Sequence, residues 1–142
     1  MPTTELELEQ RMKENCYNFN GYSINGNSIH EGFGIDKLGS LFAWYYTERG
    51  NRDNLKYFQS EKEIVEYAFK QIKSDMWAKV HRVGFTVDKV KIDELAQTLK
   101  KRNIEFLQDS IPYYGSQSPV YGIFVFGCSN RRVIDLKDKY HQ

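Results

Sequence analysis

Apolar and polar residues alternate along much of the first half of the chain, which is the pattern of half-buried β-strands. In the clearest segment, LFAWYYTE, residues Phe42, Trp44 and Tyr46 fall on one face of the strand and the intervening residues on the other. An Asn25-Gly26 pair in an earlier segment favours a tight turn, because both residues readily take positive φ. The segments expected to be extended are 17–27, 28–35, 41–48 and 55–58.

Other segments repeat apolar residues every three or four positions, which is the spacing of an amphipathic helix. One of them begins at Ser60, which forms an S-x-x-E capping box with Glu63. Another follows Asp88, a good N-cap, and stops at Asn103, a residue that tolerates the left-handed conformation at a helix end. The predicted helices are 4–16, 60–73, 89–102 and about 129–140.

The second half of the chain places strands between its helices. The strand segments there are 79–87, 104–108 and 120–128, with a proline-containing loop at 111–119. The order strand, helix, strand, strand, helix is that of half of a ferredoxin-type sandwich. We therefore predict an α+β fold with a mostly antiparallel sheet and helices packed on one face. A single domain over 1–142 is expected, with possible halves at 1–75 and 76–142.

Composition and charge narrow the classes of protein that this chain can be. The 142 residues are 40% apolar and 27% charged, as in ordinary globular domains. A net charge of +1, from 20 basic and 19 acidic residues, gives no case for nucleic-acid binding. No apolar run approaches the ~18 residues of a membrane span, and MPTTELELEQ lacks the features of a signal peptide. We expect a cytoplasmic protein with no membrane or nucleic-acid partner.

Few residues of the kind used in catalysis fall into a recognised arrangement. Cys16 and Cys128 are expected to be free, packed thiols. His30, His81 and His141 lack metal-ligand spacing, and no phosphate-binding motif is present. We predict no metal, no cofactor and no enzymatic activity. One alternative stays open, a small enzyme that uses Cys128 with His81 or His30, because a cysteine before a helix can have a lowered pKa.

The charges that follow the strongest strand pose the main functional question. Glu48, Arg49 and Arg52 are predicted at the tip of a hairpin, within reach of one another. They form either a salt-bridged turn or a recognition edge, in which arginine forks pair with carboxylates of a partner. Trp77 either contacts a partner or fills the junction of the halves. The candidate partner-binding residues are Glu48, Arg49, Arg52, Trp77, Tyr113 and Tyr114.

The same segment carries a resemblance to a known family. YYTERGNR, followed by Phe58 and by SEKE at 60–63, resembles small immunity proteins encoded beside bacterial polymorphic toxins, including those of contact-dependent growth inhibition systems. The resemblance implies a cytoplasmic, non-enzymatic protein that binds the C-terminal domain of a cognate toxin and blocks it. It assigns no binding residues, because the toxin-facing surface varies in such families. A small-molecule-binding regulatory domain is a second alternative, by analogy of fold.

Overall fold

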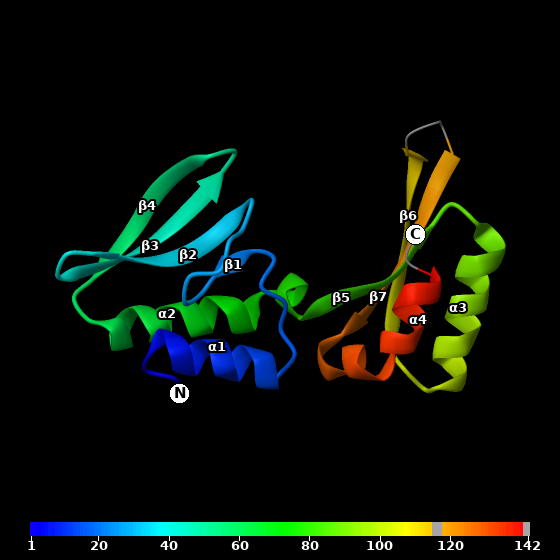
Figure 1. The fold of residues 1–142 in the computed structure, drawn as a ribbon, viewed down its shortest axis with the longest axis horizontal. Coiled ribbons are helices and arrows are strands. Elements are labelled where there is room, and N and C mark those ends of the chain that lie inside the picture. The colour runs from blue at the N-terminus through cyan, green and yellow to red at the C-terminus, as the bar shows by residue number, and fades with distance from the viewer. Residues whose placement is uncertain (115–117, 141–142) are drawn as a thin grey trace. The chain divides into compact units, whose positions relative to one another are not determined.

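The computed structural model describes residues 1–114 and 118–140, and the fold is α+β, as predicted (Figure 1). The chain divides into two compact units, Met1–Lys79 and Val80–Gln142. Each unit has its own sheet and its own hydrophobic core. The sequence placed the boundary between possible halves after residue 75, and the structure places the division after Lys79.

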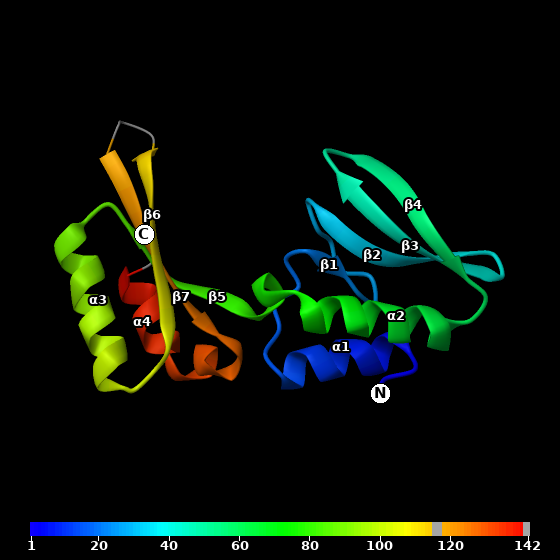
Figure 2. The ribbon, with the colours of Figure 1, turned by 180° about the vertical axis from the view of Figure 1, so that it is seen from behind.

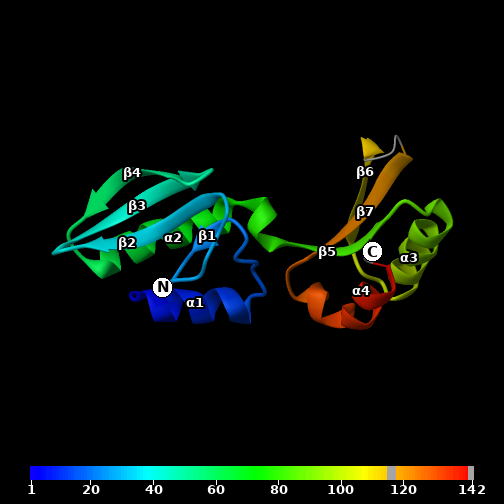
Figure 3. The ribbon, with the colours of Figure 1, turned by 45° about the horizontal axis from the view of Figure 1, so that its top comes forward.

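The first unit is a four-stranded sheet with two helices on one side, as Figure 3 shows. The strands are β1 (Tyr22–Ser23), β2 (Gly32–Leu38), β3 (Leu41–Glu48) and β4 (Asn51–Phe58), in that spatial order. The helices are α1 (Glu5–Glu14) and α2 (Glu61–Ser74), and a short 3-10 helix, η1 (Met76–Lys79), follows α2. β1 pairs with β2 in parallel, and the other two pairings are antiparallel.

Trp44 lies at the centre of the core of the first unit. Its ring stacks on Phe33 with centroids 5.6 Å apart, and it meets the Tyr67 ring edge-on at 5.7 Å. The alternation along β3 thus turns Phe42 and Trp44 toward the helices, as the sequence predicted, and the apolar stripe of α2 covers them. Among the described residues, no helix lies on the opposite face of this sheet (Figures 1 and 3).

The second unit is the predicted split β-α-β arrangement. Its elements are β5 (Val80–Thr86), α3 (Lys89–Lys101), β6 (Phe106–Tyr114), β7 (Ser118–Phe126), the 3-10 helix η2 (Gly127–Arg132) and α4 (Ile134–Tyr140). β7 lies between β5 and β6 and is antiparallel to both. Figure 2 shows α3 and α4 side by side, and their apolar residues form one core with β5 and β7.

Two predicted boundaries in the second unit are wrong. Residues 111–114 were expected in a loop, but they continue β6, with Ile111 opposite Val120. Pro112 is compatible with this strand because β6 is at the edge of the sheet and its register is irregular there. The last helix begins at Ile134 rather than near 129, because η2 precedes it. Ser118 and Pro119, also expected in the loop, begin β7, whereas residues 115–117 and His141 lie outside the described residues.

The prediction of free thiols is also wrong. Cys16 and Cys128 are both disulfide-bonded, and the chain has no free cysteine. Disulfides persist mainly in oxidising compartments, so the bonded cysteines do not support the expected cytoplasmic location. In the described part of the chain, no helix is long and apolar enough to cross a membrane.

Candidate interaction surface and groove

β3 and β4 are joined by a two-residue turn, Arg49-Gly50. Both residues have positive φ, +52° at Arg49 and +82° at Gly50, as a type I′ hairpin turn requires. Glycine adopts this conformation freely, whereas an L-residue such as arginine does so at a cost of roughly 1–2 kcal/mol. The Thr47 hydroxyl donates to the Asn51 carbonyl at 3.0 Å, which closes the end of the hairpin. The turn holds Glu48 and Arg49 at an exposed tip.

The charges of the tip border two shallow depressions. Glu48 and Arg49 line both of them, together with Tyr46 on one side and Glu31 on the other. The Tyr46 hydroxyl donates to the Glu31 carboxylate at 3.2 Å. Burial, and then the carboxylates of Glu31 and Glu48, raise the pKa of Tyr46. No ion pair between described residues joins Glu48 to Arg49, so these two residues do not form the salt-bridged turn that was one of the two alternatives.

Arg52 lies on a different face from Glu48 and Arg49. It pairs across the strands with Thr47 and so falls on the face of the sheet that carries no helix. There its guanidinium stacks 3.9 Å from the centroid of the Tyr45 ring and forms an ion pair with Asp36, at 3.0 Å. The expectation that the three charged residues lie within reach of one another is therefore wrong for Arg52.

β4 forms one edge of the sheet and is exposed from Asn51 to Tyr57. Leu55 and Tyr57 are 55% and 54% exposed. Leu55 is the extra residue of a β-bulge, because Asn54 pairs with Tyr45 and Lys56 with Trp44. The sequence analysis missed both side chains as contact residues, because LKYF has the composition of a strand packed in a core. We define the hairpin surface as Glu48 and Arg49 at the turn together with Arg52, Leu55 and Tyr57 along β4, a set that spans both faces of the hairpin.

The remaining predicted contact residues are not part of this surface. Trp77 is in η1, and its side chain is 59% exposed. Its backbone is held in place, since its N–H donates to Asp75 Oδ1 and its carbonyl accepts from Asn18, both at 2.9 Å. Tyr113 and Tyr114 end β6, and their side chains lie outside the described part of the structure.

A groove of about 370 Å³ opens on the helix-free face of the first sheet. It runs between the loop that follows β1 and the side chains of Asp36, Tyr45 and Arg52. The Tyr45 ring lies across Gly34 on β2, in a space that a Cβ at position 34 would fill. Tyr45 is only 4% exposed, but its hydroxyl, which has no hydrogen-bond partner among the described residues, is not fully buried and reaches the solvent of the groove.

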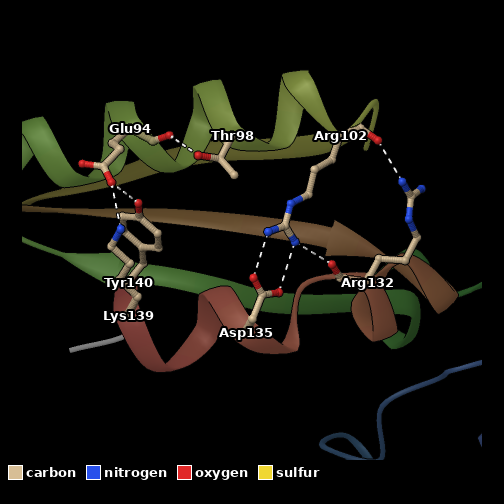
Figure 4. Close-up of polar contacts among 7 residues, drawn as sticks. All are labelled: Glu94, Thr98, Arg102, Arg132, Asp135, Lys139 and Tyr140. Atoms are coloured by element: carbon tan, nitrogen blue, oxygen red, sulfur yellow. Dashed lines mark hydrogen bonds and ion pairs between the residues drawn. The ribbon is translucent and has the colours of Figure 1, made fainter.

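Polar side chains tie α3 to α4 in the second unit (Figure 4). Arg102 donates to both oxygens of Asp135, at 3.1 and 2.8 Å, and Arg132 donates to the Arg102 carbonyl. Glu94 accepts hydrogen bonds from Tyr140 and Lys139. The hydrogen bonds from Arg102 lower the pKa of the Asp135 carboxyl. Those from Tyr140 and then Lys139 lower the pKa of the Glu94 carboxyl. Because these charged groups pair within the unit, we interpret the cluster, named here the α3–α4 clamp, as structural.

The described residues include neither a metal-ligand cluster nor a free cysteine thiol. No group of three or more His, Cys, Asp and Glu side chains among them could hold a metal ion. Cys128 is disulfide-bonded, and a disulfide sulfur is not the thiolate nucleophile that a cysteine enzyme needs. Comparison of the chain with protein-family models, curated proteins and solved structures found no match.

Proposed function

We propose that this protein is a bacterial immunity protein that binds a cognate toxin domain and neutralises it, as in polymorphic-toxin or contact-dependent growth inhibition systems. The observation that carries the proposal is the hairpin surface. Leu55 and Tyr57 are more than half exposed on an edge strand, β4, which begins at the turn that carries Glu48 and Arg49. Tyrosine and arginine are the side chains that most often dominate the binding energy of protein interfaces.

The geometry of the hairpin suits recognition of another protein. The Arg49-Gly50 turn has the tight type I′ geometry, and a side chain presented from such a turn loses less freedom when it binds. Glu48 and Arg49 supply opposite charges for pairing with a toxin, while Leu55 and Tyr57 supply apolar area to bury. The edge of β4 also offers backbone N–H and C=O groups to which an extended segment of the partner can add as a further strand.

The proposal places the protein in the cytoplasm, where it would meet a toxin that has entered the cell. The bonded cysteines favour an oxidising compartment instead, so location needs its own measurement. Fractionation of the producing cells should recover the chain with cytoplasmic markers. Recovery with periplasmic markers would contradict the proposed cytoplasmic location. Toxin binding is tested separately by co-expression.

The binding proposal is tested by co-expression with the C-terminal domain of a secreted multidomain toxin encoded beside this chain. Growth should be rescued, and the two chains should purify together. Tyr57→Ala and Arg49→Ala should each weaken the complex by about tenfold or more, as expected for interface anchors. Lys70→Ala, on an exposed position of α2, is the matched control and should bind like the unaltered chain. The proposal is overturned if the unaltered chain neither rescues growth nor purifies together with the toxin domain.

A further inference from the structure

The groove on the first sheet contains a polar atom that the protein itself does not satisfy. Tyr45 is 4% exposed, yet its hydroxyl makes no hydrogen bond to the described residues. The hydroxyl is not a fully buried unpaired atom, since Asn130 Oδ1 is the only one of that kind among the described residues, so it opens to the solvent of the groove. Because Tyr45 lines the groove, a molecule bound there can supply the missing partner.

Two opposite charges lie side by side at the same groove. Arg52 donates through Nη1 to Asp36 Oδ2 at 3.0 Å, which leaves its other N–H groups without a partner among the described residues. The second Asp36 oxygen likewise has none there. A simple anion would be attracted by Arg52 and repelled by Asp36. A simple cation would be attracted by Asp36 and repelled by Arg52. The pair is complementary to a ligand that carries adjacent positive and negative groups.

We propose that this groove binds the zwitterion of a free α-amino acid. Its carboxylate accepts from Arg52 and from the Tyr45 hydroxyl, and its ammonium group donates to Asp36. The volume of about 370 Å³ is within the range of small-molecule sites, and Ile29 provides an apolar wall for a side chain. This role goes beyond toxin neutralisation, and the site lies within the first unit.

Neighbouring charges favour the same orientation of the ligand. Glu5 lies near enough to Glu61 and to Asp36 to be repelled by each, and this repulsion adds to burial in raising the pKa of Glu5. The potential near Asp36 is therefore more negative than at Arg52. An ammonium group is favoured at Asp36, and a carboxylate at the opposite end, beside Arg52 and Tyr45.

The test is an NMR titration of the purified full chain with each of the twenty common L-amino acids. Acetate and methylammonium serve as probes of each half of the zwitterion, and N-acetylglycine methylamide serves as a neutral amide. At least one amino acid should shift the amide signals of Ser28, Tyr45 and Arg52 saturably. It should bind at least about tenfold more tightly than any of the three fragments, because it gains charged hydrogen bonds at both ends.

Substitutions in the groove test whether an amino acid binds through Tyr45 and Arg52 or contacts the protein nonspecifically. Tyr45→Phe should weaken binding about tenfold and leave the fold intact, because the hydroxyl it removes has no partner among the described residues. Arg52→Lys, which retains the charge and loses the fork, should also weaken binding. Tyr57→Phe is the matched control, since Tyr57 does not line the groove, and its affinity should be unchanged. The proposal is overturned if no amino acid binds saturably, if a fragment binds as tightly, or if Tyr45→Phe binds normally. No toxin is present, so the outcome is independent of the immunity proposal.

Discussion

The Tyr45 ring lies across Gly34, its cross-strand partner on β2, and occupies the space that a side chain at position 34 would need. This contact between an aromatic residue and a glycine on neighbouring strands positions the ring that supports Arg52. It also fixes the floor of the groove. A glycine that appears in the sequence as one of several in GYSINGNSIHEGFG is thus required by packing at this one position.

Gly34→Ala should destabilise the first unit by about 1–3 kcal/mol, because the added methyl group forces the Tyr45 ring out of its place. Unfolding in urea, followed by tryptophan fluorescence, measures the loss, and both tryptophans are in the first unit. Gly21→Ala is the control, since nothing lies within 4 Å of a Cβ there, and its effect should stay within about 0.5 kcal/mol. Equal effects of the two variants would contradict the packing argument.

Arg49→Asn should stabilise the first unit by about 0.5–1 kcal/mol. Asparagine tolerates the left-handed conformation at the first position of a type I′ turn better than arginine does. The same denaturation experiment measures the gain. Arg49→Ala also removes the charge but keeps an unfavourable side chain at positive φ, so it should give no such gain. If alanine stabilised the unit as much as asparagine, loss of charge rather than relief of backbone strain would be the cause.

Glu5→Gln should make the first unit more stable at pH 7. Burial above all, and then repulsion from Glu61 and Asp36, raise the pKa of Glu5 above its ordinary value of 4.5. The folded state therefore favours the protonated carboxyl, and stability is lost as the pH rises from 4.5 through the folded-state pKa. The advantage of the variant, measured by urea denaturation, should disappear below about pH 4.5.

Glu7→Gln is the control for this effect and should act in the opposite direction. Hydrogen bonds from Thr3 and then Thr4 lower the pKa of Glu7, so its ionised carboxylate favours the folded state. The variant should be slightly less stable at pH 7. An advantage of Glu5→Gln that persisted unchanged into acid would show that ionisation of Glu5 is not its source.

The α3–α4 clamp should weaken in acid. The pKa values of Asp135 and Glu94 are lowered from 3.8 and 4.5 by the clamp contacts. Their contribution to stability is therefore fully present above the unfolded-state values and is lost as the pH falls through the folded-state values. Hydrogen exchange of the α3 amides should accelerate below about pH 4, after correction for intrinsic rates.

Two variants test whether the clamp carboxylates cause that acid response. Asp135→Asn should reduce the pH dependence and accelerate α3 exchange at pH 7. Asp138→Asn changes an exposed acid on the same helix that is not part of the clamp, and it should leave the acid response unchanged. An acid response of the same size in Asp135→Asn would contradict the assignment.

Sequence patterns predicted the helices and strands that are determined by residues close together in the chain. β3 followed from its alternation, and the start of α2 from Ser60, whose hydroxyl accepts from the Glu63 N–H at 3.2 Å. Asp88 likewise caps α3, and Asn103 takes the left-handed conformation at its end. Each of these features depends on residues within a few positions of one another, and the sequence displays them directly.

Features that depend on strand register could not be predicted in the same way. The groove joins Asp36, Tyr45 and Arg52 from three strands, and no local spacing relates them. The bulge that exposes Leu55 appears only once β3 and β4 are aligned. The disulfide bonding of Cys16 and Cys128 carried no signal either, because two widely separated cysteines have no diagnostic spacing.

The position of β7 between β5 and β6 sets the order in which the two sheets can be completed during synthesis. Strands β2, β3 and β4 follow one another through short turns, so the first sheet can close soon after residue 58 has left the ribosome. Neither β5 nor β6 has a partner in its sheet until residues 118–126 have emerged. A nascent chain stalled before that point carries a finished first sheet and two strands awaiting their shared neighbour, and this is the stage at which a chaperone would be needed most.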